Sequence, residues 1–233
     1  MRKKILFTLA IVLLSLASAS AQSTQATINE YLKAAERGDA TGQNNLGNSY
    51  YYGYGVTQNY QQAIYWFEKA AGQGFADAQY NLASCFYNGN GIEKNLPEAI
   101  IWFEKAAKQG HAGAQNNLGT CYFNGQGVKK DPKKAYEWFE KAALQGHALA
   151  QNNLGLCYTE GKGTIRNHSK GAEMYRKAAE QGNAAGQYNL AICYDNGQGI
   201  KQDRKEAKKW LDKSAEQGNA KALKLAKKKR FNK

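Results

Sequence analysis

The sequence predicts an all-α solenoid of five 36-residue helix-turn-helix repeats, with half-repeat helices at both ends. The first observation is a repeated motif: the QNNLG motif of residues 43–47 returns in similar form every 36 residues, without insertion or deletion. Within each unit, apolar residues follow helical spacing, and a Gly-x-Gly pair separates two helical stretches. A fixed period of this length is typical of stacked units that complete each other's core.

The first helix of each repeat, helix A, is expected at about residues 40–52 in the first unit. Its buried stripe has i, i+3, i+4 and i+7 spacing and holds Gln43, Leu46, Gly47 and Tyr50. A glycine inside a helix costs about 1 kcal/mol relative to alanine, so Gly47 indicates that a neighbouring helix approaches closely. We expect the column that begins at Asn45 to tie each unit to adjacent turn backbone.

The second helix, helix B, is expected at about residues 60–72, after glycines that close helix A in the left-handed conformation. A column of N-cap residues precedes it: Asn59, Asn95, Asp131, Asn167 and Asp203. Three of them are predicted to form capping boxes, with Gln62, Glu98 and Glu206. Helix B also carries a bulky column, which we interpret as core packing in preference to a ligand cage: Trp66, Trp102, Trp138, Met174 and Trp210. Repeat four departs most, with Gly171 and Met174, and its helix B is expected to be the least stable.

The first residues have the features of a secretory signal peptide. Three basic residues precede an apolar stretch over residues 5–17, and Ala19-Ser20-Ala21 gives a cleavage pattern. We therefore expect a periplasmic or secreted protein that is not transmembrane after cleavage, with an uncleaved N-terminal anchor as the alternative. The predicted segments are the signal peptide (1–21), an N-terminal capping helix (22–38), repeats 39–74, 75–110, 111–146, 147–182 and 183–218, and a C-terminal capping helix with a basic tail (219–233).

The net charge of +13 is concentrated at the two ends of the chain. The signal segment carries three of these charges and residues 221–233 carry seven, which leaves the repeats at only +3. This distribution argues against a nucleic-acid partner, because no basic face runs along the repeats. The basic tail is a candidate contact for an anionic envelope polymer or lipid head groups.

Cysteine and histidine columns do not indicate a metal, cofactor or catalytic centre. Equivalent positions in successive units lie about 8–10 Å apart, beyond the reach of about 7 Å between Cα atoms in a disulfide. We therefore expect buried free thiols at Cys85, Cys121, Cys157 and Cys193. His111 and His147 are expected to be solvated turn residues, and no catalytic motif appears.

A second set of helix-A positions differs between units while the framework repeats. These positions begin at Thr41, Asn44, Asn48 and Tyr51 and recur in each repeat. Such variation is expected of a recognition surface on a fixed scaffold, and neutral drift on an exposed face is the alternative. The predicted partner-binding anchors are Tyr51, Tyr80, Tyr87, Phe123, Leu156, Tyr188 and Ile192.

The repeated pattern A-x-x-[GA]-Q-x-N-L-[GA] followed by A-x-x-W-[FY]-x-K-A-A-x-Q-G resembles the Sel-one-like repeat (SLR) family, relatives of tetratricopeptide repeats, over residues 26–226. The resemblance implies a right-handed superhelix whose concave side, lined by A helices, receives a protein partner. Members are adaptors, regulators of envelope signalling and exported proteins that meet host factors. Cysteine-rich members carry two cysteines per repeat and are linked to β-lactams, whereas this chain has one cysteine in each of repeats two to five and no S-x-x-K motif.

The function expected from sequence is therefore an exported protein–protein interaction scaffold or adaptor without enzymatic activity. A secreted host-interaction factor and a weak β-lactam or peptidoglycan hydrolase are the alternatives.

Overall fold

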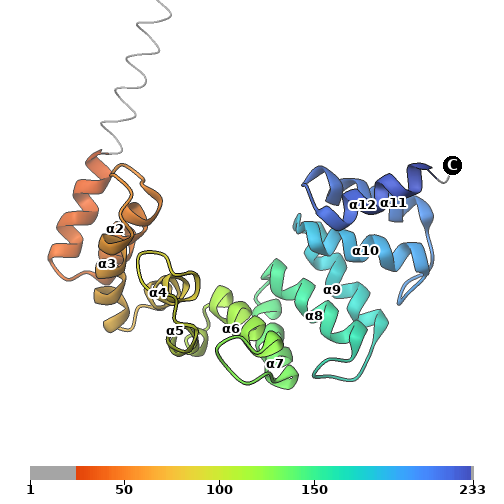
Figure 1. Cartoon of the computed structure of the whole chain (residues 1–233), viewed down its shortest axis with the longest axis horizontal. Helices are drawn as coiled ribbons and strands as arrows, with labels where there is room; N and C mark the ends of the chain where they lie inside the picture. Colours follow the sequence, from red (N-terminus) through yellow and green to blue (C-terminus); the bar gives the residue numbers. More distant parts are fainter. Residues whose placement is uncertain (1–24, 232–233) are drawn as a thin grey trace, which may run out of the picture. The chain divides into compact units, whose positions relative to one another are not determined.

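The computed structural model describes residues 25–231, which form helices joined by turns, with no strand in that range (Figure 1). This confirms the predicted all-α solenoid of helix pairs. The signal-peptide prediction for residues 1–21 lies outside the described residues.

Each repeat contains one A helix and one B helix. The A helices are α2 (Ala40–Tyr52), α4 (Ala76–Asn88), α6 (Ala112–Asn124), α8 (Ala148–Glu160) and α10 (Ala184–Asn196). The B helices are α3 (Tyr60–Gly72), α5 (Leu96–Lys108), α7 (Pro132–Leu144), α9 (His168–Glu180) and α11 (Arg204–Glu216). A helix that includes residues 25–36 precedes them, and α12 (Ala220–Phe231) follows.

The chain forms two compact units, the first ending at Ala106 and the second beginning at Ala107. In the first unit α3 packs against both α2 and α4, and in the second each helix from α6 to α12 packs against the next (Figure 1). Helix pairs that share neighbours in this way bury a continuous core within each unit.

The Gly-x-Gly turns do two different tasks. The first glycine closes helix A in the left-handed conformation, as at Gly161 (φ 69°). The second brings the turn onto the preceding helix B: a methyl group at Gly163 would overlap the backbone carbonyl of Pro132, and one at Gly199 would overlap that of His168. The pair is therefore both a helix end and a contact between repeats.

The predicted N-caps of the B helices are confirmed, but the capping boxes are wrong in their second half. The Asn59 side chain accepts from the N–H of Gln62 at 3.0 Å, and the other four caps bond in the same way. The N–H of Asn59 donates to the Tyr50 carbonyl at 2.8 Å, and every cap finds the equivalent helix-A carbonyl. The cap N–H is therefore not free to donate to the residue three positions on, as a capping box requires. The Glu206 carboxylate instead accepts from the side chains of Lys209 and Trp210.

Close packing explains the small residues inside the A helices. A Cβ at Gly47 would lie 2.6 Å from the ring of Phe67, and one at Gly119 would lie 2.7 Å from the ring of Phe139. Both rings are at most 2% exposed. The predicted close approach is confirmed, and the neighbour is the helix B of the same repeat.

A buried glutamine in each A helix joins three helices. Its amide nitrogen donates to a carbonyl of the preceding helix B, as from Gln151 to Ala143 at 3.4 Å and from Gln115 to Ala107 at 3.1 Å. Its amide oxygen accepts from a glutamine at the end of its own helix B, as from Gln181 to Gln151 at 2.7 Å. The same column holds Gln43, Gln79, Gln115, Gln151 and Gln187, each 4–5% exposed. Among the described residues, no buried side-chain polar atom lacks a partner.

We expect Gln151→Leu to lower the free energy of unfolding by about 1–3 kcal/mol, because the Gln181 amide loses its acceptor and the Ala143 carbonyl loses one of its donors. Urea denaturation followed by circular dichroism measures this. The control is Gln202→Leu, which removes an exposed bond to Asp195 and should cost about 0.5 kcal/mol or less. The double variant Gln151→Leu/Gln181→Leu should lose less than the sum of its single variants. Equal losses in Gln151→Leu and the control would contradict this role.

Candidate functional site

The predicted anchors lie on the A helices but are half-buried, not freely exposed. Tyr51 is on α2, and Tyr80 and Tyr87 are on α4. The remaining anchors are Phe123 on α6, Leu156 on α8, and Tyr188 and Ile192 on α10. Because each is partly buried, substituting one perturbs packing as well as surface.

In the first unit the anchors pack on the buried rings of the B helices. The rings of Tyr80 and Tyr87 lie 6.0 and 6.1 Å from that of Phe103. Tyr51 lies 6.4 Å from Phe67 and accepts a 2.6 Å hydrogen bond from the amide of Asn90. Burial raises the pKa of the Tyr51 phenol, and the Asn90 hydrogen bond opposes that rise.

Two tyrosines that the sequence analysis missed are more exposed than any anchor. Tyr52 and Tyr54, in and after the last turn of α2, are 57% and 64% exposed. Their rings stack at 5.3 Å, and Tyr51 meets Tyr52 edge-on at 4.8 Å. The equivalent positions in the other repeats are polar or charged, and comparing the turn columns as well as the helix columns would have revealed them.

A hollow of about 350 Å³ lies beside these tyrosines. Tyr54 lines it together with Asn45, Asn48 and Ser49 of α2, and with Tyr31 of the preceding helix. We name Tyr51, Tyr52 and Tyr54 the tyrosine cluster. The cluster and the hollow give the first unit an exposed aromatic surface next to amide and hydroxyl groups, a composition typical of binding surfaces.

In the second unit the structure brings two predicted anchors together. Phe123 and Leu156 line one groove of about 180 Å³, with Thr120 and Asn153 beside them. The ammonium of Lys162 lies 5.0 Å from the Phe123 ring. By contrast, Tyr188 packs on the core of Ala191, Leu211 and Ala222 at the C-terminal end.

The asparagine column does not tie units to turn backbone, and that expectation is wrong. Asn81 donates to the side chains of Asn44 and Asn48, at 2.9 and 3.1 Å. Asn153 and Asn189 make the equivalent bonds, to Asn116 and Asn152 at 3.0 and 2.8 Å. Neighbouring A helices are close enough for amides to meet directly. Asn44 and Asn116, both assigned to the variable surface, are thus buried framework residues at 4% and 5% exposure.

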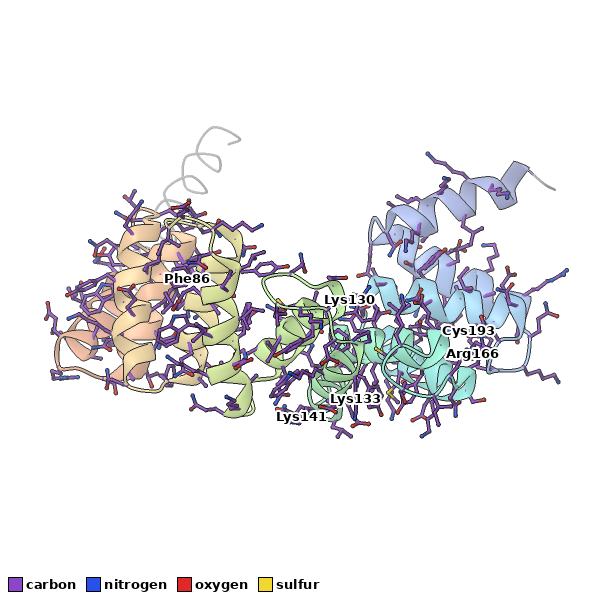
Figure 2. The ribbon with its side chains drawn as sticks, turned by 60° about the horizontal axis from the view of Figure 1, so that its bottom comes forward. Phe86, Lys130, Lys133, Lys141, Arg166 and Cys193 are labelled. Atoms are coloured by element: carbon purple, nitrogen blue, oxygen red, sulfur yellow. The ribbon has the colours of Figure 1, made fainter. Side chains whose placement is uncertain are left out.

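The four cysteines are free and buried, as predicted. Cys193 lies among the packed helices of the second unit (Figure 2). Burial raises the pKa of the Cys85 and Cys157 thiols to about 12, and that of Cys121 and Cys193 to about 11. These thiols therefore stay protonated at neutral pH, which opposes nucleophilic or metal-binding chemistry.

The two histidines predicted to be solvated are half-buried helix caps, which corrects that expectation. His111 Nδ1 accepts from the N–H of Ala114 at 3.0 Å, and His147 Nδ1 accepts from that of Ala150 at 3.3 Å. They stand where Asn183 caps α10. A neutral imidazole can serve here because Nδ1 keeps its lone pair.

We expect acid to weaken the His147 cap. Burial and then the charge of His111 lower the pKa of His147, so protonation favours the unfolded chain. The stability from the neutral cap is complete above the unfolded pKa of about 6.5 and is lost as the pH falls below it, towards the lower folded-state pKa. From pH 7.5 to 5 the parent should lose more stability than His147→Asn, whose cap does not titrate. Urea denaturation at both pH values measures this, and parallel losses in the two proteins would contradict it.

Within residues 25–231, no group of three or more His, Cys, Asp or Glu side chains is arranged to hold a metal ion. No helix in the described part of the chain has the length and apolar character needed to cross a membrane.

Stacked helix pairs with buried repeated positions and variable, partly exposed positions define an α-solenoid repeat protein. The family model for the Sel1 repeat matches residues 40–75, 76–111, 112–147, 148–183 and 184–219. The chain belongs to the Sel1 repeat family.

Solved structures agree with this assignment. A Sel1 repeat protein from Oxalobacter formigenes is 35% identical with a TM-score of 0.82, covering 91% of this chain and 85% of that one. The protein c5321, a protective antigen present in uropathogenic Escherichia coli strains, displays an SLR fold and is 35% identical with a TM-score of 0.75. That match covers 92% of this chain and 50% of c5321, so this chain spans about half of that protein. Immunity protein PA5088 from Pseudomonas aeruginosa, at 22% identity and a TM-score of 0.55 over 83% of this chain and 73% of that one, shares the fold alone. No curated protein matches the sequence.

Proposed function

We propose that the chain is an exported protein–protein interaction scaffold that binds its partner through the A-helix side, with the tyrosine cluster as the principal contact. The observation that carries this proposal is the stacked pair Tyr52 and Tyr54, more than half exposed beside a hollow of about 350 Å³. Stacked aromatic rings that are exposed to water are unfavourably solvated and add nothing to the hydrophobic core, so they mark a contact surface. Tyrosine is also enriched at binding hot spots. Export rests on the signal-like residues 1–21.

A host-facing role is the second candidate, and it rests on the similarity to c5321, a protective antigen of uropathogenic strains. Mature protein used as bait against bacterial envelope fractions and against host secretions distinguishes the two roles. The source of the captured protein decides between them.

We expect Tyr52→Ser/Tyr54→Ser to weaken binding of the captured partner at least tenfold while leaving the fold intact, because both rings are exposed. The matched control is Tyr65→Ser, which removes a tyrosine of α3 that is 46% exposed and meets Trp66 edge-on. Titration calorimetry gives the affinities, and circular dichroism checks the fold. An unchanged affinity in the double variant would exclude the tyrosine cluster as the contact.

We also propose that the basic C-terminal helix adds an electrostatic contact with anionic envelope groups. Lys221, Lys224, Lys227 and Lys228 are exposed on α12. Lys227 occupies the column that Gly47 begins, where a further helix B would have to pack closely. A lysine at this position opposes further stacking and leaves the charges on the end of the array.

Replacing these four lysines by glutamine should weaken binding to phosphatidylglycerol vesicles at least tenfold at low salt, since each basic residue near an anionic surface contributes about 1 kcal/mol. Binding by the parent should also disappear as salt rises. The control is the same replacement at Lys129, Lys130, Lys133 and Lys134, four exposed lysines of the third repeat. Vesicle sedimentation measures both. Salt-independent binding, or equal losses in the two variants, would contradict the proposal.

A further inference from the structure

The tryptophan column fills a repeated space in the fold. In repeats two and five the indole packs against a core formed by its own repeat and the preceding one. Trp102 contacts the core that includes Ile64 and Leu82, and Trp210 contacts the core that includes Tyr175 and Leu190. Four repeats place tryptophan here, whereas repeat four has Met174.

A lysine three residues after each tryptophan lies over its ring. The ammonium to ring-centroid distances are 5.6 Å for Lys69 and Trp66, and 3.7 Å for Lys105 and Trp102. The pairs Lys141–Trp138 and Lys213–Trp210 are at 4.3 and 4.7 Å, and Figure 2 labels Lys141 on α7. Repeat four keeps the lysine, Lys177, without the ring, and its ammonium pairs with Glu173 at 2.8 Å.

An open cavity of about 370 Å³ is lined by Met174, the residue that stands in the tryptophan column of repeat four. Leu154 and Tyr158 of α8 line it together with Met174 and Lys177 of α9. An unbranched methionine is slimmer than an indole, so the space is not filled from within the chain. The volume falls in the range of small ligand pockets.

The rim of the cavity carries an apolar side chain that the fold does not explain. Leu144, at the end of α7, is 83% exposed and lines the cavity. The other repeats have glycine, lysine or glutamate in this column: Gly72, Lys108, Glu180 and Glu216. Two changes peculiar to repeats three and four, an exposed leucine and a missing tryptophan, thus meet at one place.

The charges around the cavity compensate each other. Glu140 accepts a 2.5 Å hydrogen bond from Tyr136, Glu173 pairs with Lys177, and the Lys170 ammonium lies 5.5 Å from the Tyr158 ring. Two acids and two lysines among the lining residues give no net charge. An uncharged ring can therefore enter without burying an unpaired ion, and Lys177 can meet it as the other lysines meet tryptophan.

We propose that this cavity between α7, α8 and α9 receives an indole-sized aromatic side chain of a partner polypeptide, which takes the place of the absent tryptophan. The site is lined by residues of α7, α8 and α9 and shares no residue with the tyrosine cluster. It rests on the proposed scaffold function only for the polypeptide nature of its ligand. The ring site itself is tested with a small probe, so a failure to capture any partner leaves this test unaffected.

Methyl NMR can detect binding in the cavity directly, because the full chain contains two methionines, Met1 and Met174, and Met174 lines the cavity. In protein labelled with ¹³C-methyl methionine, Met174→Leu identifies the cavity signal by its loss. N-acetyltryptophanamide should shift the Met174 methyl signal upfield in a saturable manner, through the ring current. N-acetylleucinamide, the aliphatic control, should cause no such shift.

The lysine is tested by a matched pair of variants. Lys177→Met should reduce the affinity for N-acetyltryptophanamide severalfold, and Lys141→Met, at the same position over Trp138, should leave it unchanged. A third variant, Met174→Trp, should raise the midpoint of urea denaturation relative to Met174→Leu, because the chain then supplies its own indole.

Three results would overturn the proposal. They are a Met174 methyl signal that does not move with N-acetyltryptophanamide, one that moves equally with the leucine probe, and a Met174→Trp protein that is less stable than Met174→Leu. The first two exclude an aromatic site, and the third excludes an indole-shaped space.

Discussion

The buried glutamine of each A helix is the interaction on which the rest of the array depends. A side-chain amide donates through its nitrogen and accepts through its oxygen, and here the nitrogen bonds the preceding helix B while the oxygen bonds the end of the helix B in its own repeat. A buried amide without partners is costly, so the three helices must keep one separation and one register. The small residue at Gly119 and the ring of Phe139 then fill the gap that this separation leaves.

Much of this fold can be predicted from the sequence, because the 36-residue period repeats local signals five times. Helix ends follow from left-handed glycines and from caps such as Asn59, whose side chain acts on the next few residues. The missing second half of the capping boxes could not be predicted, since the cap N–H of Asn59 donates to the carbonyl of Tyr50 in another helix. The histidine caps, His111 and His147, could not be predicted for a different reason. Their acceptor is the ring Nδ1, which caps helices less often than an Asn or Asp oxygen.

The surface was harder to predict than the framework. Helical spacing places Asn44 on the same face as Tyr51, but spacing along one helix does not show how near the next A helix lies. The amide contact with Asn81 therefore turned an expected surface residue into a framework residue. Tyr52 and Tyr54 lie at the end of α2 and in the turn that follows, where the repeated glycines predict a chain reversal but not an exposed aromatic pair. In repeat four, a position assigned to the surface contributes to packing. Thr159 reaches into the space that Gly171 leaves, and its hydroxyl lies 3.1 Å from that of Tyr175.

The amide bridges also constrain how such a protein can change its length. A bond that joins Gln181 to Gln151, thirty residues apart, and a turn whose Gly163 rests on Pro132 leave little freedom for partial insertions. Gain or loss of an entire 36-residue module keeps every bridge intact, because each module ends in the bonding groups that the next one needs. Evolution of this scaffold should therefore proceed in discrete steps, and the reach of its recognition surface should be quantised in units of one helix pair.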